Sequence, residues 1–513
     1  MIVQRGDFFE VLKKFSYPGQ YACDTETTGL KWYADNRLFS VILADEEDGY
    51  YFNFNHEADH LGNKPDEKCI LPREWITHFQ LAFDHRDSLW FLHNAKFDMG
   101  MLAREGLSLT GQVHCTEAVA RLIDNRFKHY NLDTCLKRMA ERLKKPVTQK
   151  QNVKTYLNKH KLYEDIYVKG KGKPVREYHF HKLPFELVAP YGVVDGKATR
   201  ELGLYQIDRL EKMARKVPAI RNVVENEKAL TKTLHKMEKA GLPLDTRYTD
   251  ECLTEELASA QRAKDEFRAL SGVDFTDSRA VFQPVFDRLG LDYPETDKGN
   301  ASFAKEALAE IDNPLANVIT EIRWLEKRCS SYYSSFQYFQ HKGMIHAQAC
   351  QGGAGTGRMS YRDPSLQNVP KPDEDKADSE RVRKCFRPKP DTVLFMPDYD
   401  QMEYRMMLDV AGEEKVINMI LHEGLDVHTA TANEMQRGVT RKQAKTFNFM
   451  LLYGGGAQKL ADALGVSLED AKDLKTLYFE KLTKVKIWTR EVKKYATREG
   501  FIINWFGRVV RID

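Results

Sequence analysis

The alternation of apolar and polar side chains divides the chain into an α/β first part and a helical second part. Short apolar runs rich in β-forming side chains occur over the first 205 residues, as expected for strands joined by helices. From about residue 206 to residue 340 the apolar positions recur with the helical period instead. The expected strands are Tyr21–Cys23, Leu38–Ala44, Tyr50–Phe54 and Ser88–Leu92, and the expected helices are Glu201–Lys216, Val223–Ala240, Thr249–Leu270, Ala301–Glu310 and Val318–Phe339. The aromatic-rich end of the last helix is expected to belong to the core.

A further helix is predicted near the end of the chain, and one side of it carries a regular stripe. Arg441, Lys445, Phe449 and Tyr453 recur every four residues, so each lies only about 40° further round the helix than the one before. The stripe is cationic where the helix begins and aromatic where it ends. A phosphate group at the first end and a stacked base at the second would suit a nucleoside triphosphate.

The boundaries of this helix are also encoded locally. Thr440 and Gln443 have the spacing of a capping box, and a glycine run starting at Gly454 stops the helix. Cations in a first turn oppose the helix dipole, which costs roughly 0.3–1 kcal/mol each when they are exposed. An anion bound there would reverse that cost, because the free backbone N–H groups attract the same anion. The alternative is a solvated basic helix end above an aromatic core contact, and the helix by itself leaves both interpretations open.

Composition describes an ordinary globular protein of several domains. The chain has 513 residues, 42% hydrophobic and 30% charged, with a formal net charge of +3. That charge does not by itself indicate nucleic acid, so a DNA-binding surface would require local clustering. No apolar run approaches the ~20 residues of a membrane span, and the first residues lack the features of a signal peptide. Eight scattered cysteines without a Cys-x-x-Cys pair indicate reduced thiols and a cytoplasmic enzyme.

Three groups of acidic residues stand at the ends of elements in the first part. Asp24 and Glu26 share one face of an extended segment, because side chains alternate along a strand. Asp98 follows the strand at Ser88–Leu92 and lies near the start of a helix. Tyr191 and Asp195 are four residues apart, which places a phenol beside a carboxylate on one helix face. Together these positions predict a single acidic site.

Gathered carboxylates repel one another unless hard cations lie between them, and Mg²⁺ or Mn²⁺ with oxygen ligands suits such a site. Two such ions would support attack of water on phosphorus. The three groups in this order resemble the DEDD superfamily of 3′–5′ exonucleases, whose proofreading members have an RNase H-like α/β fold. The resemblance implies that Asp24, Glu26, Asp98 and Asp195 hold the metals. It also implies that Tyr191 orients the attacking water.

The chain becomes basic between the second and third acidic groups. From Lys137 to Lys182 there are 14 Lys and Arg residues against 4 Asp and Glu residues, with tyrosines between them. The glycines, lysines and proline of Lys169–Pro174 predict an exposed loop or hairpin tip. A solvated surface is one interpretation. Contact with a DNA backbone is preferred, because the segment interrupts an expected nuclease.

Polar, glycine-rich motifs return after residue 343. They are Thr-Gly-Arg with Arg358, Gln-Asn-x-Pro with Gln367 and Asn368, and a later segment with Arg383. Such side chains can reach phosphates or base edges in the minor groove. An apolar run at Thr392–Met396 follows and is expected to be a buried strand that presents Asp398, a suitable position for a metal ligand.

The order of the motifs in the second part is that of a known family. Thr-Gly-Arg, Gln-Asn-x-Pro, Asp-Tyr-x-Gln-x-Glu-x-Arg, Asp-x-His and Arg-x₃-Lys-x₃-Phe-x₃-Tyr-Gly occur in that sequence. The chain therefore resembles family A DNA polymerases, from about residue 20 to residue 513. The resemblance implies template-directed DNA synthesis with a proofreading exonuclease, and two Mg²⁺ or Mn²⁺ ions in each active site. Primer–template DNA and dNTPs are the implied partners. The exonuclease motifs begin at Asp24 with no 5′-nuclease domain before them, as is typical of phage-type enzymes.

The resemblance also assigns roles to single residues. Asp398 would bind both polymerase metals, and Glu403 would lie under the incoming sugar and exclude a 2′-hydroxyl. Arg358 and Arg383 would contact primer or phosphate. The residues implied to bind the nucleotide are Glu403, His428, Arg441, Lys445, Phe449 and Tyr453. Those implied to contact DNA are Arg358, Gln367, Asn368 and Arg383.

The expected domains follow from these motifs. Residues 1–205 would form the α/β RNase H-like exonuclease domain and residues 206–340 a helical thumb. Residues 341–410 would begin the palm and residues 411–513 would form the fingers, giving an incomplete α+β right-hand region. If the chain is phage-encoded, it would work in the cytoplasm of a bacterial host.

One family motif is missing from this sequence. A third polymerase motif, His-Asp-Glu on a palm hairpin, supplies the second metal-binding carboxylate in the family, and this chain has no histidine after His428. Asp398 alone would have to hold two cations beside the developing phosphoryl charge. One hypothesis is a split polymerase whose remaining palm is supplied by a second polypeptide. The other is an incomplete or shortened sequence.

A second class of function stays open beside these. The chain could act alone as a 3′–5′ exonuclease whose polymerase part only holds DNA. The presence of Asp398, Glu403, Arg441 and Lys445 together favours a polymerase, because simple DNA holding does not need them all. A purely structural DNA-binding protein fits poorly with two carboxylate sites.

Overall fold

The computed structural model describes residues 1–143, 153–296, 298–371, 380–435 and 439–512. The chain forms two compact units. The first contains residues 1–393 and 504–510, and the second contains residues 394–503 and 511–513.

The first unit is built on a five-stranded mixed sheet with strand order β3-β2-β1-β4-β5. Central strand β1 pairs antiparallel with β2 and parallel with β4. The strands are β1 (Gln20–Thr27), β2 (Leu38–Ala44), β3 (Gly49–Asn53), β4 (Leu89–Leu92) and β5 (Gln112–Cys115). The four strands expected from the sequence are confirmed, and β5 is additional.

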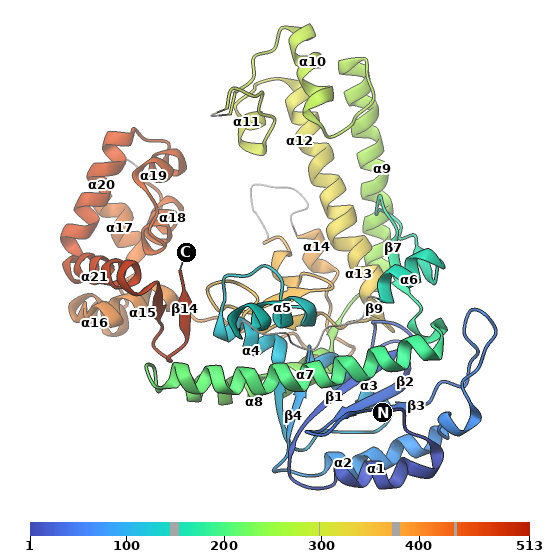
Figure 1. The fold of residues 1–513 in the computed structure, drawn as a ribbon. Coiled ribbons are helices and arrows are strands. Elements are labelled where there is room, and N and C mark those ends of the chain that lie inside the picture. The colour runs from blue at the N-terminus through green and yellow to red at the C-terminus, as the bar shows by residue number, and fades with distance from the viewer. Residues whose placement is uncertain (144–152, 297, 372–379, 436–438, 513) are drawn as a thin grey trace. The chain divides into compact units, whose positions relative to one another are not determined.

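Helices cover both faces of this sheet (Figure 1). On one face α1 (Phe8–Lys14) and α2 (Phe79–Phe83) pack against alternate strand residues such as Cys23, in an apolar core rich in phenylalanine and tryptophan. On the other face α7 (Phe185–Ala214) contacts β1, β2, β3 and β4. Ala22 belongs to the core on this second face. Asp24 and Glu26 share its side of β1, because side chains alternate along a strand, so both carboxylates face α7.

A basic hairpin leaves this layer and contacts the helices that follow it. It consists of β6 (Tyr163–Ile166) and β7 (Val175–Tyr178). Its tip is partly covered, because Lys169 pairs with Asp250 at 3.3 Å and the Ser334 hydroxyl donates to the Lys169 carbonyl. A Cβ added at Gly170 would lie 2.4 Å from Ser334 Oγ. The predicted hairpin is confirmed, and Lys169, Gly172 and Lys173 at its tip are exposed as expected, although Lys169 also contacts α9 and α13.

The proposed DNA contact of the basic segment stays a prediction, and residues 144–152 of that segment lie outside the described residues. The remaining helices around the sheet are α3 (Ala95–Arg104), α4 (Thr116–Ile123), α5 (Leu132–Leu143) and α6 (Val153–Lys159).

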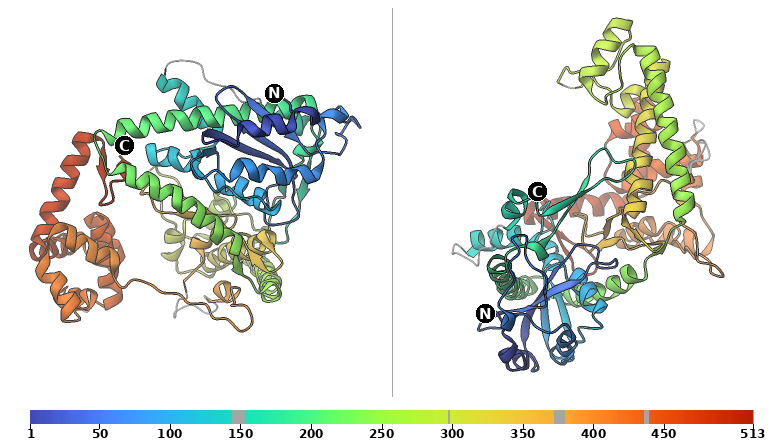
Figure 2. Two further views of the ribbon diagram at one scale, coloured as in Figure 1. Left: turned by 90° about the horizontal axis from the view of Figure 1, so that it is seen from below. Right: turned by 90° about the vertical axis from the view of Figure 1, so that its right-hand side faces the viewer.

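A helical arm follows. Its two long helices, α9 and α12, run side by side in both views, with α10 and α11 at one end (Figures 1 and 2). Phe267, Phe282 and Ile319 lie in its core. The helices are α8 (Ile220–Ala240), α9 (Thr246–Ser271), α10 (Arg279–Leu289), α11 (Lys305–Ala309) and α12 (Pro314–Lys327), then a π-helical turn at Arg328–Tyr333 and α13 (Ser334–Phe339).

Two details of the arm test the sequence predictions. The helix expected at Ala301–Glu310 is wrong over its first turn. Ala301 forms a β-bridge with Glu295, and the Ser302 N–H donates to the Pro294 carbonyl, so this backbone is already engaged outside a helix. The aromatic end of the last long helix is core, as expected, since Tyr332, Tyr333 and Phe336 are buried.

Short strands and one helix complete the first unit. They are β8 (Leu242–Pro243), β9 (Gln340–His341), β10 (Met344–Ile345), β11 (Gln348–Cys350), β12 (Ser360–Arg362) and α14 (Arg381–Lys384). Strand β10 joins β8 to β9, and β11 pairs with β12. The β11–β12 pair flanks the Thr-Gly-Arg motif.

The second unit is helical and has a core of its own. Tyr404, Leu408, Phe447 and Leu460 are buried in it. Its elements are α15 (Met402–Ala411), α16 (Glu414–His422), α17 (Val427–Met435), α18 (Arg441–Leu452), α19 (Ala457–Leu464), α20 (Leu468–Lys481), α21 (Thr483–Glu499) and β13 (Phe501–Ile503). The last strand, β14 (Val509–Arg511), falls partly in each unit.

The strand expected at Thr392–Met396 is wrong. The segment has no regular structure, and Val393, Phe395 and Met396 are 86%, 86% and 79% exposed. A β-strand needs a neighbour to satisfy its backbone N–H and C=O groups, and none of the described residues supplies one here. Asp398 consequently lies in an exposed, irregular stretch rather than at the end of a buried strand.

Two further expectations concern the whole chain. All eight cysteines are free thiols, seven of them buried, in line with the reduced state expected. No helix in the described parts of the chain is long and apolar enough to cross a membrane.

Candidate functional site

The first candidate site lies where β1, α3 and α7 meet in the first unit. Glu26 on β1 is 8% exposed, and Asp24 beside it is only partly buried. Asp98 stands in the first turn of α3, as expected from the sequence, and is 2% exposed. The Thr25 hydroxyl donates a hydrogen bond of 2.7 Å to Asp98 Oδ1. Strand and helix are therefore joined through the site itself.

The Asp98 carboxyl is held in a setting that disfavours its charge. Its pKa is raised well above its ordinary value, first by burial and then by the charge of Asp24, while the Thr25 hydrogen bond acts in the opposite direction. A buried carboxyl beside a second carboxylate gains from any cation that enters. The arrangement is thus suited to a positively charged ligand.

Helix α7 brings the other two predicted residues to the same place. Tyr191 is 7% exposed and Asp195 is 4% exposed, one helical turn apart. Burial raises the pKa of the Tyr191 phenol far above its usual range, and the charges of Glu26, Asp195 and Asp24 raise it further. The five residues predicted from the sequence therefore lie close enough to influence one another's ionisation.

Glycines allow α7 to approach the sheet this closely. A Cβ added at Gly192 would lie 2.9 Å from the Tyr51 ring, and one at Gly196 would lie 2.7 Å from Ile42. Real Cβ atoms essentially never come within 3.0 Å of another heavy atom. Gly192 directly follows Tyr191 along the helix, and Gly196 directly follows Asp195. Neither glycine was identified from the sequence. A Gly-x₃-Gly spacing on one face of a predicted helix was the available signal.

The donor set of this site fits a hard divalent cation. Four carboxylates offer oxygen ligands only, which Mg²⁺ and Mn²⁺ prefer. The repulsion between Asp98 and Asp24 is the kind of cost that a cation relieves. The residues that the structure describes include no group of three or more His, Cys, Asp or Glu side chains already arranged to share an ion.

The second candidate site is α18 in the second unit. Its capping box is formed as expected: Gln443 Oε1 accepts from the Thr440 N–H at 2.9 Å, and Thr440 Oγ1 accepts from the Gln443 N–H at 3.3 Å. The predicted helix at Arg441–Leu452 is confirmed. Arg441 and Lys445 are exposed, whereas Phe449 is half-buried. Tyr453, the last member of the stripe, is 63% exposed, so only Phe449 is partly covered by the protein.

Arg441 is engaged by a carboxylate at the start of the neighbouring helix. Its Nε donates to Asp426 Oδ2 at 2.5 Å. The guanidinium holds the pKa of the Asp426 carboxyl well below its usual range. Asp426 also accepts from the His428 N–H and the Thr429 hydroxyl at the N-terminus of α17. Asp426 thereby caps α17 and also forms an ion pair with Arg441, the first cation of the stripe.

His428 lies beneath the stripe as a neutral ring. It is 2% exposed, its ring centroid is 5.8 Å from that of Phe449, and burial lowers its pKa. The Asn448 amide donates to His428 Nδ1 at 3.0 Å and to the Thr431 hydroxyl at 3.0 Å. Asn448 is fully buried and was not identified from the sequence. An amide on the apolar face of a helix was the signal for a specific partner.

Glu403 and Tyr453 meet at the far end of the stripe. The Tyr453 hydroxyl donates to the Glu403 carboxylate. Glu403 stands in the first turn of α15 and Tyr453 ends α18. Among the predicted nucleotide-binding residues, Glu403 and Tyr453 are the furthest apart in sequence, and the structure brings them into contact.

The four predicted DNA-contacting residues lie in the first unit around the Thr-Gly-Arg loop. Arg358 is exposed. Gln367 donates to the Met359 carbonyl at 2.9 Å, and Arg383 donates to the Pro370 carbonyl at 2.7 Å. The side chains of Gln367 and Arg383 therefore stabilise the loops to which they bind.

Asn368 behaves in the same way and is held from two sides. Its side-chain amide donates to Ser365 Oγ at 2.9 Å, and its backbone carbonyl accepts from the Tyr332 hydroxyl at 2.7 Å. The Gln-Asn-x-Pro loop is thereby attached to the buried aromatic end of the helical arm.

A buried network supports the Thr-Gly-Arg turn and was not identified from the sequence. Arg508 donates to Glu227, and Gln351 donates to the other oxygen of the same carboxylate at 2.7 Å. Gly357 has φ +85°, and a Cβ added there would lie 2.8 Å from Arg508 Cδ. Glycine beside Arg358 therefore satisfies both the left-handed backbone and the close approach of Arg508.

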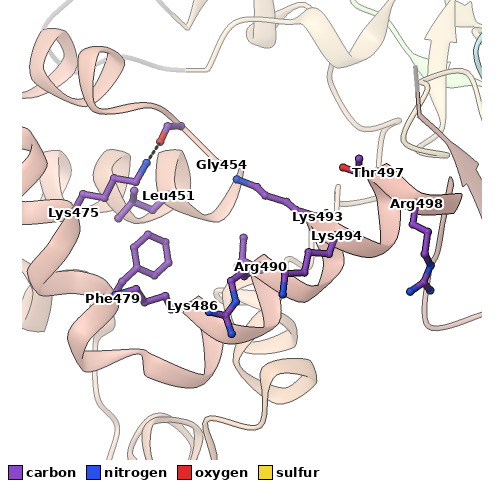
Figure 3. Close-up of a pocket in the computed structure, with 12 residues that line it drawn as sticks. Leu451, Gly454, Lys475, Phe479, Lys486, Arg490, Lys493, Lys494, Thr497 and Arg498 are labelled. Atoms are coloured by element: carbon purple, nitrogen blue, oxygen red, sulfur yellow. Dashed lines mark hydrogen bonds between the residues drawn. The ribbon is translucent and has the colours of Figure 1, made fainter. Parts of the chain in front are cut away.

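A cleft of about 720 Å³ opens beside the end of α18, lined by parts of α20 and α21 (Figure 3). Six of its lining side chains are cationic: Lys475, Lys486, Arg490, Lys493, Lys494 and Arg498. Lys475 is fixed by donating to the Gly455 carbonyl at 2.9 Å. This cleft was not expected from the sequence.

Comparison with known proteins finds two family models that match different parts of the chain. A model described as DNA polymerase family A matches residues 247–513, and a model described as 3′–5′ exonuclease matches residues 3–168. DNA polymerase I of Chloroflexus aurantiacus is 27% identical over 519 residues, covering 95% of this chain and 50% of that protein. DNA polymerase I of Pseudomonas aeruginosa is 26% identical, covering 99% of this chain and 54% of that protein.

A phage protein and a solved structure extend the comparison. DNA polymerase DpoZ of Acinetobacter phage SH-Ab 15497 is 25% identical, covering 96% of this chain and 82% of that protein. The polymerase domain of Pol1 from M. smegmatis, solved with DNA primer–template and dNTP, has a TM-score of 0.74 at 20% identity over 99% of this chain and 81% of that one. That likeness establishes the fold alone. The chain spans about half the length of the bacterial relatives named above.

The polymerase model covers the helical arm from α9 onward, the Thr-Gly-Arg loop and the whole α18 stripe, which together are part of a match to more than half of the chain. The protein belongs to DNA polymerase family A.

Proposed function

We propose that the protein is a template-directed DNA polymerase with a 3′–5′ proofreading exonuclease, acting on primer–template DNA and dNTPs in the cytoplasm. The observation that carries this proposal is the α18 stripe, with Arg441 at one end and the Tyr453–Glu403 contact at the other. The names of its relatives and the DNA and dNTP bound to the structural neighbour support it.

At the exonuclease site, Asp24, Glu26, Asp98 and Asp195 would hold divalent cations, as members of the family and its exonuclease domains generally do. Mg²⁺ is the proposed ion and Mn²⁺ the substitute. When bound, the cations would activate water and stabilise the leaving oxygen. The raised pKa of Tyr191 keeps its phenol protonated at neutral pH, so Tyr191 orients water by donating or accepting a hydrogen bond and not as a phenolate base.

At the polymerase site, Arg441 and Lys445 would bind the triphosphate and Phe449 would pack against the sugar and base. Arg441 must first leave Asp426, and the triphosphate supplies the charge that replaces it. His428 lies behind the stripe as a neutral ring held by Asn448. The contact with Tyr453 keeps Glu403 in position to exclude a 2′-hydroxyl.

The DNA-binding role belongs to the loops of the first unit. Arg358 is exposed on the Thr-Gly-Arg turn and would reach the primer strand. Gln367, Asn368 and Arg383 would exchange their present loop contacts for DNA edges and phosphates, or would hold the loop in shape while its backbone makes the contact.

Asp398 would bind the polymerase metals, and two-metal phosphoryl transfer needs a second carboxylate beside it. We infer that this carboxylate comes from a palm segment carrying the His-Asp-Glu motif, for which a second polypeptide is one source. Adding such a segment in trans should raise primer extension, and Asp398→Ala should abolish the gain.

The proposed function is tested by two variants in one assay. With a labelled primer–template, Mg²⁺, dNTPs and the palm segment added in trans, Asp24→Ala should abolish primer shortening and leave extension intact. Asp398→Ala should abolish extension and leave shortening intact. If Asp398→Ala changes no product under any condition, the polymerase proposal fails.

A second candidate function is a 3′–5′ exonuclease whose polymerase part only holds DNA. The observation that favours it is the contrast between the two metal sites. The exonuclease carboxylates Glu26, Asp98 and Asp195 are buried in packed elements, whereas Asp398 lies in an exposed, irregular segment. In the same assay this candidate predicts products that depend on Asp24 alone.

A further inference from the structure

A pocket of about 320 Å³ lies in the first unit, where α7, α8 and β5 meet, and it shares no lining residue with either candidate site. Its inner wall is apolar, because Leu210 on α7 and Ile220 and Val224 on α8 are buried and line it. Ile220 and Val224 are four residues apart and so share one face of α8, the helix that contacts both α7 and β5. Concave, mainly apolar pockets of this size are suited to small molecules.

The four charged residues that line this pocket form two ion pairs at its rim. Arg221 binds Glu211 and Lys228 binds Glu225, with 2.7 Å between nitrogen and oxygen in each pair. Glu211, Arg221 and Glu225 are exposed, whereas the apolar wall is buried. Each cation is balanced by a carboxylate, so the pocket has no excess charge to attract a phosphate or a metal ion. A neutral ligand is therefore favoured.

One polar ring belongs to the buried part of the lining. His114 on β5 is 1% exposed, and burial lowers its pKa to about 4, so the ring is neutral at neutral pH. Its Nε2 lies 2.9 Å from Gln206 Oε1, and the Gln206 amide nitrogen donates to the Thr116 carbonyl at 2.8 Å. Because the second contact fixes Gln206 Oε1 as the acceptor, Nε2 must carry the proton of the neutral ring.

The other ring nitrogen of His114 is therefore an acceptor, and it has no donor. Its Nδ1 makes no hydrogen bond to any residue that the structure describes. Nδ1 of His181 and Nδ1 of His235 are sealed from solvent without a partner, whereas Nδ1 of His114 is not sealed. The pocket is the open space beside this buried ring, so Nδ1 faces it. A ligand with a donor would satisfy this nitrogen, and a ligand without one would displace water and leave it unpaired.

The volume of the pocket limits the size of the ligand. A cavity of about 150 Å³ holds one benzene molecule, so a pocket of about 320 Å³ has room for two fused rings. We propose that this pocket, the His114 pocket, binds a small, neutral, mainly apolar molecule that donates one N–H or O–H hydrogen bond to His114 Nδ1. This site does not depend on the proposed polymerase or exonuclease function.

The test uses indole and benzofuran as probes of the full wild-type chain. The two molecules have nearly the same shape, but benzofuran has a ring oxygen in place of the indole N–H. Isothermal titration calorimetry should show indole binding about tenfold more tightly, because benzofuran leaves Nδ1 without a donor. Indole should also raise the temperature of thermal unfolding, since it binds the folded chain.

Three variants locate the bound probe. Val224→Phe fills the pocket and should abolish the binding of both probes. Asn226→Phe is the matched control, because it adds the same ring to α8 at an exposed position outside the lining, and it should leave both dissociation constants unchanged. His114→Phe keeps a ring of similar size but removes the acceptor, so indole should lose its preference over benzofuran. Thermal unfolding without ligand verifies that each variant is folded.

Three results would overturn the proposal. They are equal affinities of indole and benzofuran for the wild-type chain, unchanged binding of indole in Val224→Phe, and no binding of either probe. If Val224→Phe does not fold, the wild-type comparison and His114→Phe still decide whether Nδ1 accepts from the ligand. None of these measurements requires DNA synthesis or DNA cleavage, so a failure of the His114 pocket is distinguishable from a failure of the proposed function.

Discussion

Lys96 and Glu238 form an ion pair with Lys96 Nζ 3.4 Å from Glu238 Oε1, and their side chains are only 11% and 3% exposed. Lys96 lies on α3, two residues before Asp98, and Glu238 lies on α8. Glu238 also accepts from the Ala349 N–H at 2.7 Å. The exonuclease helix, the base of the helical arm and strand β11 thus meet at one buried carboxylate.

Removing the lysine should be costly because it leaves that carboxylate buried and unpaired. Burial already raises the pKa of Glu238 despite the neighbouring Lys96. We expect Lys96→Met to lower the free energy of unfolding by about 3–5 kcal/mol, measured by urea denaturation. Lys68→Met is the control, because the Lys68–Asp66 pair is 57% exposed on both sides. Equal effects of the two variants would contradict the assigned role.

The closeness of α7 to the sheet gives a second prediction. Gly196→Ala adds a Cβ 2.7 Å from Ile42, so the helix must move outward or the sheet side chain must shift. We expect a loss of about 1–3 kcal/mol in stability. Exonuclease turnover should fall by about 10²-fold, because Tyr191 and Asp195 move with the helix. In Gly172→Ala, where a Cβ meets nothing within 4 Å, both quantities should stay near wild type.

Asn448 provides a third prediction, in the second unit. Asn448→Ala removes the donor to His428 Nδ1 and to Thr431, leaving buried acceptors without a partner. The expected loss in unfolding free energy is about 1–3 kcal/mol. Thr446→Ala changes an exposed residue on the same helix and should cost less than about 0.5 kcal/mol. A neutral Asn448→Ala variant would show that the His428 contact contributes nothing to stability.

The buried side chain of His114 should make the free energy of unfolding depend on pH. His114 is 1% exposed, its Nε2 donates to Gln206 Oε1 at 2.9 Å, and burial lowers its pKa to about 4. An unfolded histidine has a pKa of about 6.5. Between these values the unfolded chain binds a proton that the folded chain does not. His114 therefore has no effect on stability above about pH 6.5 and opposes folding increasingly as the pH falls to about 4.

The variant His114→Gln should remove this contribution. The decrease of unfolding free energy with falling pH should become shallower by up to about 1.4 kcal/mol per pH unit between pH 6.5 and 4. His129→Gln, at an exposed position, should leave the slope unchanged. Urea titrations at several pH values give both slopes, and parallel curves for His114→Gln and wild type would contradict the assignment.

A fifth prediction concerns the ion pair between Asp426 and Arg441 at the start of α18. Asp426→Asn keeps an acceptor for the N-terminus of α17 but removes the charge that binds Arg441. Because the triphosphate would no longer compete with a carboxylate at residue 426 for Arg441, the KM for dNTP should fall severalfold. The kcat should be less affected. Single-nucleotide incorporation kinetics measure both constants. A raised KM would instead mean that Asp426 positions Arg441 for binding.

Sequence reasoning succeeded where a local pattern determines the outcome. The strands at Leu38–Ala44 and Tyr50–Phe54 follow from their own side chains, and the Thr440 capping box follows from residues three apart. The capping and strand signals each lie within a few residues. The acidic groups could be related only through the resemblance of their motifs, because Asp24 and Glu26 lie inside β1 and Asp195 lies inside α7 rather than at the ends of elements.

It failed where the deciding partner is distant in sequence. Thr392–Met396 has β-forming side chains, but no described segment pairs with it. The docking of the Lys169 tip depends on Asp250 and Ser334, which a count of charges could not supply. The predicted domain limits stay predictions, because no observation separates residue 205 or 340 from its neighbours.

The β6–β7 hairpin connects the helical arm to α7 within the first unit. Its tip is held by α9 and α13 through Asp250 and Ser334, and its second strand runs within a few residues into α7, the helix of Tyr191 and Asp195. The hairpin is therefore a direct link through which a displacement of α9 or α13 would reach the helix that carries Tyr191 and Asp195.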